Sequence, residues 1–524
     1  MSETVRSYTR VSPRTYRPPG RSRSGKWILL IVVIALIVGG LAWLTRDSQP
    51  IANFFPRDQR LGAVINNPIE CRSRIVASPL WSALPDDARL ANLPELLMQN
   101  FGMPEWVLNN LVRERIYVAA NDLDTFSDVV CLSRMTRLGA LFERTFSLIG
   151  WVDYDSSGGL ALRHLPDEEI YYAVRGRVLV ASPSRDTLIE ALTLPAEAAI
   201  TEDDLQALGQ HGPEDVQGIY VLDAESLLGR NFAHVGFAVK VVADETRLDL
   251  RAVPHENAPR LFRELIADAS PRDLAEPPPG LAALSLDFGR PAADVWKAAL
   301  AAAGQSGWPG QIDDMMMEAE VRNWADVRDL LVNLTGSQGP GVRVALAGIE
   351  TDEFVPLPEL AFTFDADRNS VMELLAVASQ PSPGDEGWAM WPRYDAAIQR
   401  LYIPMAGGPA LEPTAGVYGD GLLLASSRRV GDDLLGRAYE RRPTTKPGNL
   451  YLRLNPQAFV EQCVEAGRLL AEDGLLRGYS TETFDDQAAR WQRAAAAVES
   501  TWGIARAESG TVTAEIHVVS RSGS

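Results

Sequence analysis

Residues 172–188 read YAVRGRVLVASPSRDTL, and residues 415–434 read AGVYGDGLLLASSRRVGDDL. In both stretches a Val-x-Gly turn leads into an apolar strand that ends in Ala-Ser, at Ala181–Ser182 and at Ala425–Ser426. Polar residues that favour the start of a helix come next. The two stretches therefore predict the same unit twice, a β-hairpin followed by a helix.

Other segments of the first half also have counterparts in the second half, before and after this unit. The counterparts follow in the same order, and the first pair is separated by about 220 residues. Strand-like runs alternate with amphipathic helical runs in each half of the chain. This order predicts an internal duplication, and two unrelated α+β domains are the alternative. The other counterparts are 61–66 with 281–287, the helical segments around Trp81 and Trp296, 115–121 with 342–348, 128–134 with 359–365, 151–165 with 388–403, 218–228 with 449–460, and 237–253 with 504–520.

The boundary between the halves is predicted at 269–280, where Pro271 and Pro277–Pro279 favour a stiff, extended linker. Residues 51–268 and 281–524 then form two tandem α+β domains, each long enough for its own core. Hairpins mixed with single crossovers predict mixed or mainly antiparallel sheets with helices on one face.

An uncharged apolar run, WILLIVVIALIVGGLAWL, covers residues 27–44. At roughly 1.5 Å per residue, such a helix nearly crosses a hydrocarbon core of about 30 Å. Residues 1–26 hold seven basic residues and one acidic residue and predict a disordered cytoplasmic tail. We expect residues 27–44 to anchor the chain in the lipid bilayer with the remainder outside the cytoplasm. A cleaved signal peptide is the alternative.

The composition limits the classes of partner. The chain has 524 residues, of which 46% are hydrophobic and 23% are charged, as in globular proteins. The net charge of −19 argues against nucleic acid as a partner. Cys71, Cys131 and Cys463 form neither a disulfide framework nor a metal-binding spacing. A bond between Cys71 and Cys131 and three free thiols are both left open.

A search for catalytic motifs nominates no catalytic, cofactor-binding or metal-binding residue. The five histidines never form the His-x-x-x-His pair of helical zinc sites, and no Gly-x-Ser-x-Gly elbow or Gly-x-x-x-x-Gly-Lys-Ser/Thr loop occurs. Acidic stretches at 153–159 and 365–370 are interpreted as a hairpin turn and as a helix start capped by Asn369, not as calcium loops. The acidic, methionine-containing stretch at 313–320 is interpreted as a solvated helix face, and Trp388 and Trp391 as core residues.

Three stretches carry a family resemblance: FFPRDQRLGAVINNP at 54–68, EPPPGLAALSLDFGRPAADVWKAAL at 276–300 and GIYVLDAESLL at 218–228. In each, a strand is followed by Asp or Asn and then by a helical run. The chain resembles bacterial single-pass envelope proteins whose large extracytoplasmic region is known only as a domain of unknown function. The resemblance extends over about residues 54–520 and implies an envelope location, but it implies no active-site residue.

These observations favour a membrane-anchored, extracytoplasmic binding or scaffold protein of the bacterial envelope, with an envelope protein as partner and no enzymatic activity. We expect the partner to bind in a groove between the halves near the 269–280 linker. One alternative is an envelope hydrolase with dispersed carboxylate catalysts, which leave little local sequence signal. Another is an inner-membrane subunit of a larger envelope complex.

Overall fold

The computed structural model describes residues 49–79, 109–112, 114–121, 128–149, 153–157, 159–165, 170–208, 215–242, 244–304, 314, 329, 341–351, 355–379, 393–404, 408–419, 421–437, 442–444, 446–476 and 480–521. The predicted tail at 1–26 and the predicted membrane helix at 27–44 lie outside these residues. So do Trp81, Trp388 and Trp391. Within the described ranges, no helix has both the length and the apolar composition that crossing a membrane requires.

In the described part of the chain the fold is α+β, with one large antiparallel sheet of 20 strands. The strands of the first half pair in the order β4-β5-β6-β7-β3-β2-β1-β8-β9-β10. They are β1 (Leu61–Asn66), β2 (Arg115–Ala120), β3 (Val130–Arg134), β4 (Asp153–Ser157), β5 (Leu160–Leu165), β6 (Ile170–Arg175), β7 (Val178–Ser182), β8 (Val216–Val221), β9 (Phe232–Val241) and β10 (Glu245–Pro254).

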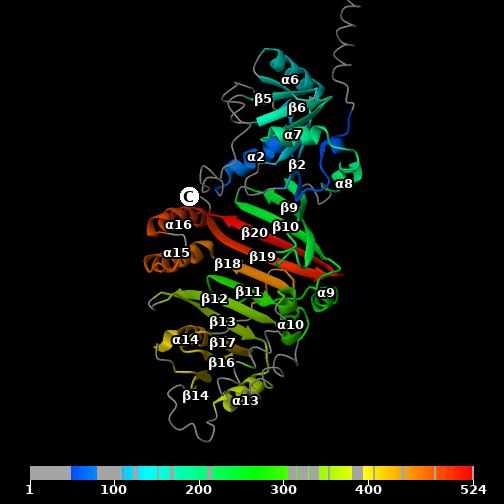
Figure 1. Cartoon of the computed structure of the whole chain (residues 1–524). Helices are drawn as coiled ribbons and strands as arrows, with labels where there is room; N and C mark the ends of the chain where they lie inside the picture. Colours follow the sequence, from blue (N-terminus) through cyan, green and yellow to red (C-terminus); the bar gives the residue numbers. More distant parts are fainter. Residues whose placement is uncertain are drawn as a thin grey trace, which may run out of the picture.

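The strands of the second half pair in the corresponding order, β14-β15-β16-β17-β13-β12-β11-β18-β19-β20. β10 pairs with β20 and joins the halves into one sheet, so green β9 and β10 lie beside red β20 and β19 in Figure 1. The strands are β11 (Ala282–Leu286), β12 (Val342–Glu350), β13 (Leu357–Phe364), β14 (Arg393–Asp395), β15 (Arg400–Tyr402), β16 (Thr414–Tyr418), β17 (Gly421–Ala425), β18 (Leu450–Leu454), β19 (Val498–Glu508) and β20 (Thr511–Ser520).

The registers of corresponding strands also agree. Cys131 of β3 pairs with Ala181 of β7, and Ala361 of β13 pairs with Ala425 of β17. β10 ends the strand order of the first half, and β20 ends that of the second half. Because these corresponding strands pair with each other in an antiparallel ladder, an approximate twofold axis passes near the middle of the ladder. The Asp249–Glu515 pair lies there.

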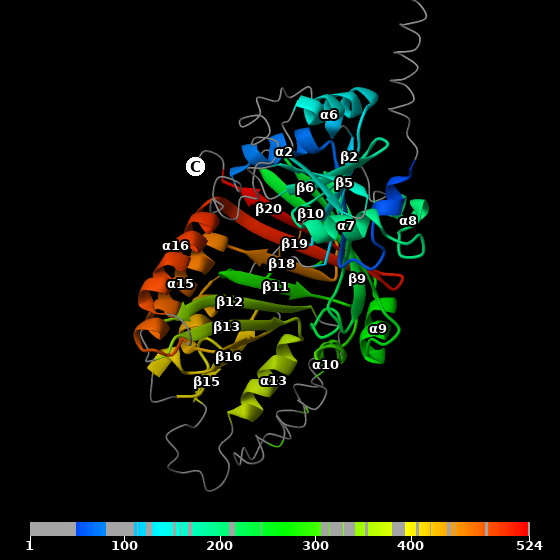
Figure 2. The same cartoon turned by 45° about the horizontal axis from the view of Figure 1, so that its top comes forward.

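Each repeated hairpin leads into a helix, as the sequence predicts. Ser184 caps α7 (Arg185–Leu192) by accepting a hydrogen bond from the Thr187 amide, and Ser427 caps α14 (Arg428–Leu435) by accepting one from the Val430 amide. The remaining helices used below are η1 (Ile51–Phe54), α2 (Pro68–Ala77), α6 (Arg137–Ile149), α8 (Glu202–Ala207), α9 (Arg260–Ala267), α10 (Ala292–Ala302), α13 (Arg368–Ala378), α15 (Pro456–Glu472) and α16 (Thr481–Ala496). In both views α15 and α16 lie together at one side of the sheet, while α9 and α10 lie at the opposite side (Figures 1 and 2).

The prediction that helices cover only one face of the sheet is wrong in the second half. Leu422 and Leu423 are adjacent in β17 and both are almost completely buried. Adjacent side chains in a strand point to opposite faces. Leu422 packs in the core beneath α13 and Leu423 in the core beneath α14, so both faces of this part of the sheet are covered by helices.

Two local predictions need correction. The N-cap of α13 is Asp367, whose side chain accepts a hydrogen bond from the Ser370 amide at 2.9 Å, and not Asn369, which lies inside the first turn. The run at 223–228 forms turns rather than a helix, with the Asp223 carboxylate accepting a hydrogen bond from the Glu225 amide. Its counterpart in the second half starts α15 because Pro456 occupies the first helical position.

The predicted linker lies against the second half of the sheet. Leu274 and Ala275 are buried, and bridges join Arg272 to Gly448 and Ala275 to Pro443. The Ser285 hydroxyl of β11 donates a hydrogen bond to the Ala275 carbonyl at 2.7 Å. These contacts tie the connection between the halves to the sheet.

Candidate functional site

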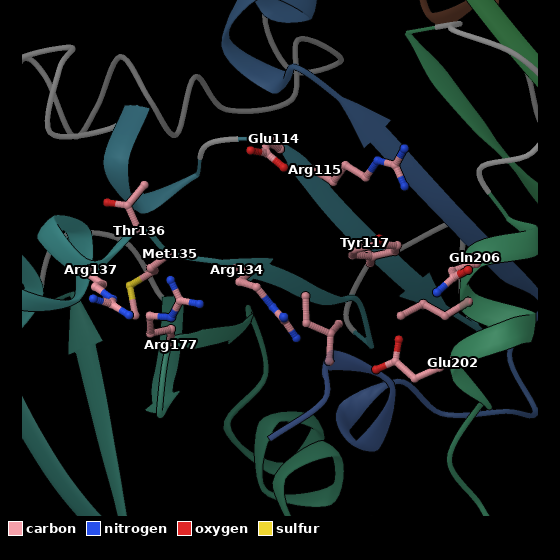
Figure 3. Close-up of a pocket in the computed structure, with 12 residues that line it drawn as sticks. Glu114, Arg115, Tyr117, Arg134, Met135, Thr136, Arg137, Arg177, Glu202 and Gln206 are labelled. Carbon is pink, nitrogen blue, oxygen red and sulfur yellow. The ribbon is translucent and has the colours of Figure 1, made fainter. Parts of the chain in front are cut away.

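A hollow of about 860 Å³ lies in the first half (Figure 3). It lies between the ends of β2 and β3 on one side and the two short helices η1 and α8 on the other. We call it the arginine hollow, because four arginines line it. The described residues that line it are Ile51, Glu114, Arg115, Tyr117, Arg134, Met135, Thr136, Arg137, Arg177, Glu202, Leu205 and Gln206.

Regular secondary structure places each of these arginines. Arg115 is the first residue of β2, Arg134 is the last residue of β3, and Arg137 is the first residue of α6. Arg177 lies in the β6–β7 turn, which Gly176 permits with a φ of +64°. The Met135 amide donates a hydrogen bond to the Arg177 carbonyl at 2.8 Å, and this bond brings the turn against the end of β3.

The other wall of the hollow combines apolar and acidic groups. Ile51 and Leu205 are buried. Glu202 and Gln206 come from α8, whose start is capped by the Thr201 side chain. In the view of Figure 3, Arg137 and Arg177 lie on one side of Arg134, and Glu202 lies on the other side. Arg115 lies on the same side of Arg134 as Glu202 in this view, so that side carries basic as well as acidic and apolar groups.

Among the residues that the structure describes, the lining holds four arginines and two glutamates. Among the described residues, nothing forms an ion pair with the guanidinium of Arg115 or of Arg137. Guanidinium groups bind carboxylates and phosphates through paired N–H donors. Although the chain is acidic as a whole, this hollow can attract a small anion, because potentials inside a concave surface depend on the local charges.

The fold requires neither Arg115 nor Arg134. Arg115 occupies the last pair of the β1–β2 ladder, and the last pair of the β11–β12 ladder holds Val342 at the corresponding position. Arg134 occupies the last pair of the β3–β7 ladder, where the second half has Phe364. The same strand arrangement thus forms with apolar residues at both positions, and only the first half has the basic lining.

A second charged cluster lies at the join between the halves. Glu515 accepts hydrogen bonds from Lys446 at 2.6 Å and from His517 at 2.8 Å, and its carboxylate lies 3.6 Å from Arg247 of the first half. His517 also contacts Glu245 of the first half and stacks on Trp502 at 3.8 Å. We call these six residues the join cluster.

Opposing effects set the protonation of Glu515. Burial acts to raise the pKa of Glu515, but the hydrogen bonds from Lys446 and His517 and the positive charges of Lys446 and Arg247 outweigh burial and lower it. The carboxylate is therefore ionised and already saturated with donors. The join cluster therefore links the two halves through paired charges.

The hydrolase alternative depends on a pair of carboxylates in a cleft. Glu350 and Glu359 are both buried, yet Arg429 forms ion pairs with both of them, and Ser427 donates a further hydrogen bond to Glu359. Neither carboxylate lines the arginine hollow. Both carboxylates are ion-paired within the protein, so this pair gives the alternative no support.

The groove that the sequence predicts between the two halves, near the linker, holds only a small space. A space of about 230 Å³ lies between α9 and α10, next to the linker, and an ion pair between Arg290 and Asp268 lies on its lining. The larger hollow lies in the first half instead. Within the described residues, no group of three or more His, Cys, Asp or Glu side chains is arranged to hold a metal ion.

The remaining sequence candidates are placed as follows. Residues 153–157 form β4, and Gly159 makes the turn to β5, so the hairpin prediction is confirmed. Cys71, Cys131 and Cys463 are free thiols. Burial raises the pKa of Cys71 and of Cys131 to about 11. Most of the acidic stretch at 313–320 lies outside the described residues.

The sequence analysis did not single out the arginines of the hollow. A signal was present, because Arg134-Met-Thr-Arg137 and Arg175-Gly-Arg177 are short basic stretches in an acidic chain. They are about 40 residues apart in the sequence. Only the pairing of β3 with β7 brings them together.

Comparisons with known proteins identify no family for this chain. No family model matches the chain, and no curated protein matches it. Two solved structures of TP0453 are similar over 43% of this chain. Crystal form III shows 9% identity and a TM-score of 0.26 over 89% of that chain, and crystal form I shows 7% identity and a TM-score of 0.26 over 88% of that chain.

Proposed function

We propose that this chain is a membrane-anchored, extracytoplasmic binding protein of the bacterial cell envelope and that the arginine hollow is its binding site. The observation that carries the binding function is that four described arginines line one hollow and that the fold does not demand two of them, Arg115 and Arg134. Binding sites are typically concave and hold a few convergent polar groups among apolar ones.

The two halves are proposed to descend from one duplicated α+β unit. The agreement of strand order, of ladder register and of the Ser-capped helices after the repeated hairpins supports this origin. After duplication, one copy can keep a site while the other loses it. The apolar residues Val342 and Phe364 at the positions of Arg115 and Arg134 fit such a divergence.

The proposed location of the protein in the cell envelope is based on the amino-terminal sequence. The apolar run at 27–44 and the basic residues before it support a single membrane anchor with the carboxyl-terminal bulk outside the cytoplasm. An anchor of this kind would keep the arginine hollow close to the membrane surface.

Protease protection tests the location. In spheroplasts of the native host, added protease should digest the chain beyond residue 50 while an amino-terminal tag survives. Survival of the bulk of the chain in intact spheroplasts, together with its digestion after lysis, would contradict the proposed topology.

Affinity capture tests the binding function. The full-length chain is recovered from detergent-solubilised native membranes and compared with a control that carries residues 1–50 only, and with Arg134→Gln. We expect molecules that are enriched with the full chain and reduced with Arg134→Gln. Equal recovery with all three proteins would contradict a binding site in the hollow. Stoichiometric recovery of membrane proteins with the 1–50 control would favour a subunit that assembles through its anchor.

A further inference from the structure

We infer that the chain has a second binding site, for a small organic monocarboxylate, on the sheet face where the two halves join. The site is a hollow of about 310 Å³, and its described lining comes from β9 and β10 of the first half and from β19 and β20 of the second half. These four strands lie side by side in Figure 1. We call this space the join hollow. It shares no described lining residue with the arginine hollow.

Three side chains form a row across the join hollow. Arg251 of β10 pairs with Thr513 of β20, and Thr513 pairs with Arg506 of β19. Residues that lie opposite each other in neighbouring strands point to the same face of the sheet. Gly236 and Ala238 of β9 line the hollow beside this row, and their small size leaves space above the strands.

Arg251 and Thr513 are the groups that a ligand can use. The Arg251 side chain is exposed, and no described residue forms a hydrogen bond or an ion pair with its guanidinium group. The exposed Thr513 hydroxyl likewise has no partner among the described residues. Two parallel N–H groups of an arginine fit the two oxygens of a carboxylate, and a neighbouring hydroxyl can donate a further hydrogen bond. This pair of groups therefore favours a carboxylate.

The other charges of the join hollow limit the ligand to one negative charge. Arg247 forms an ion pair with Asp249 at 2.7 Å, and a further ion pair joins Arg506 to Glu515 at 3.8 Å. Asp249 precedes Arg251 by two residues in β10 and pairs with Glu515, so both carboxylates lie on the same face as the row. A phosphate monoester, with a charge of about −2, would face these carboxylates, and the described lining offers no second unpaired cation to balance it.

Modification of arginines by phenylglyoxal tests the site residue by residue. The full chain in detergent is treated at mildly alkaline pH and constant ionic strength, and mass spectrometry of its peptides gives the modification rate of each arginine. Benzoate at about ten times its dissociation constant should lower the rate at Arg251 by about tenfold, because the fraction of free site falls by that factor. The neutral analogue benzamide should leave the rate unchanged. Arg57 is the matched control, since it is exposed, has no side-chain partner among the described residues and lies outside the described lining of the join hollow.

Two further comparisons test the class of ligand. Phenyl phosphate should need a concentration at least about tenfold higher than benzoate for the same protection of Arg251, because of its second charge. Thr513→Val removes the hydroxyl but keeps Arg251 as the reporter, and it should raise the benzoate concentration for half protection by about three- to tenfold. Unchanged thermal unfolding of Thr513→Val shows that the hydroxyl, and not the fold, accounts for the difference.

Protection of Arg251 by phenyl phosphate at a lower concentration than by benzoate would overturn the carboxylate assignment. Equal protection by benzamide and benzoate would overturn it as well, because charge would then play no part. Absence of protection by every probe, or an Arg251 that phenylglyoxal does not modify, would overturn the site itself. None of these outcomes bears on the arginine hollow, whose binding function the capture experiment decides.

Discussion

Replacement of Glu515 by glutamine should weaken the join between the two halves. Glu515 is 8% exposed, so its carboxylate loses most of its water and depends on Lys446 and His517 for hydrogen bonds. Hydrogen bonds to charged groups contribute about 1.5–3 kcal/mol each. Lys446 and Arg247 are 42% and 41% exposed, so water can solvate both cations again in the variant. We therefore expect Glu515→Gln to lower the free energy of unfolding by about 1–3 kcal/mol near neutral pH.

The stabilising effect of Glu515 should depend on pH. The pKa of Glu515 is lowered from 4.5 in the folded protein, so its contribution to stability is present above about pH 4.5 and is lost as the pH falls through the lowered value. Urea unfolding, followed by circular dichroism, should therefore show a difference between wild type and Glu515→Gln at about pH 7 that shrinks below about pH 4.5. Glu472→Gln, at the exposed end of α15, is the control and should show little difference at either pH. A difference for Glu515→Gln below about 0.5 kcal/mol, or one that does not change with pH, would refute the reasoning.

Four further outcomes follow from the packing. Leu423→Ala should lower the free energy of unfolding by about 2–5 kcal/mol in urea titrations, because Leu423 is 0% exposed and its loss leaves a cavity. Gly218→Ala should lower the melting temperature seen by circular dichroism, because a Cβ atom would lie 2.3 Å from the Gly62 carbonyl oxygen and force β1 and β8 apart. Ser427→Ala should lower the free energy of unfolding in urea titrations by about 2–4 kcal/mol, because α14 loses its cap and the buried Glu359 carboxylate loses a hydrogen bond. The Cys131 thiol, whose pKa burial raises to about 11, should react with a disulfide reagent at about pH 8 only after denaturant is added, and fast reaction of the folded chain would contradict its burial.

The strands were the most predictable part of the fold. The runs at 61–66, 115–121 and 342–348 were placed to within a few residues of β1, β2 and β12, because alternating apolar residues are a local signal. The helix predicted at 223–228 was wrong because the preference for a helix start after Asp223 gives way to turns that lead directly into β9. Local propensity does not include such a tertiary demand.

Long-range pairing was beyond sequence reasoning. The alternation of residues in β10 predicts a strand, but nothing in it specifies pairing with β20 instead of with another edge. The expected layout was therefore two separate sheets, whereas the structure has one sheet that crosses the boundary. The prediction of helices on one face was wrong for a related reason, since Leu422 and Leu423 are both apolar and bury both faces of β17.

The arginine hollow could not be predicted from the sequence, because neither local propensity nor the pattern of apolar residues identifies its residues. Its arginines lie at the ends of strands and at the start of a helix, positions where the fold tolerates many residues, so the amphipathic pattern that predicts the strands places no constraint on them. The comparison within the chain supplies the constraint that the pattern lacks. Where the second half has Val342 and Phe364, the first half has Arg115 and Arg134, although both halves form the same ladders. Arg115 forms no ion pair among the described residues, although the second half has an apolar residue at its position, and an anionic ligand in the arginine hollow gives a physical reason for a cation there.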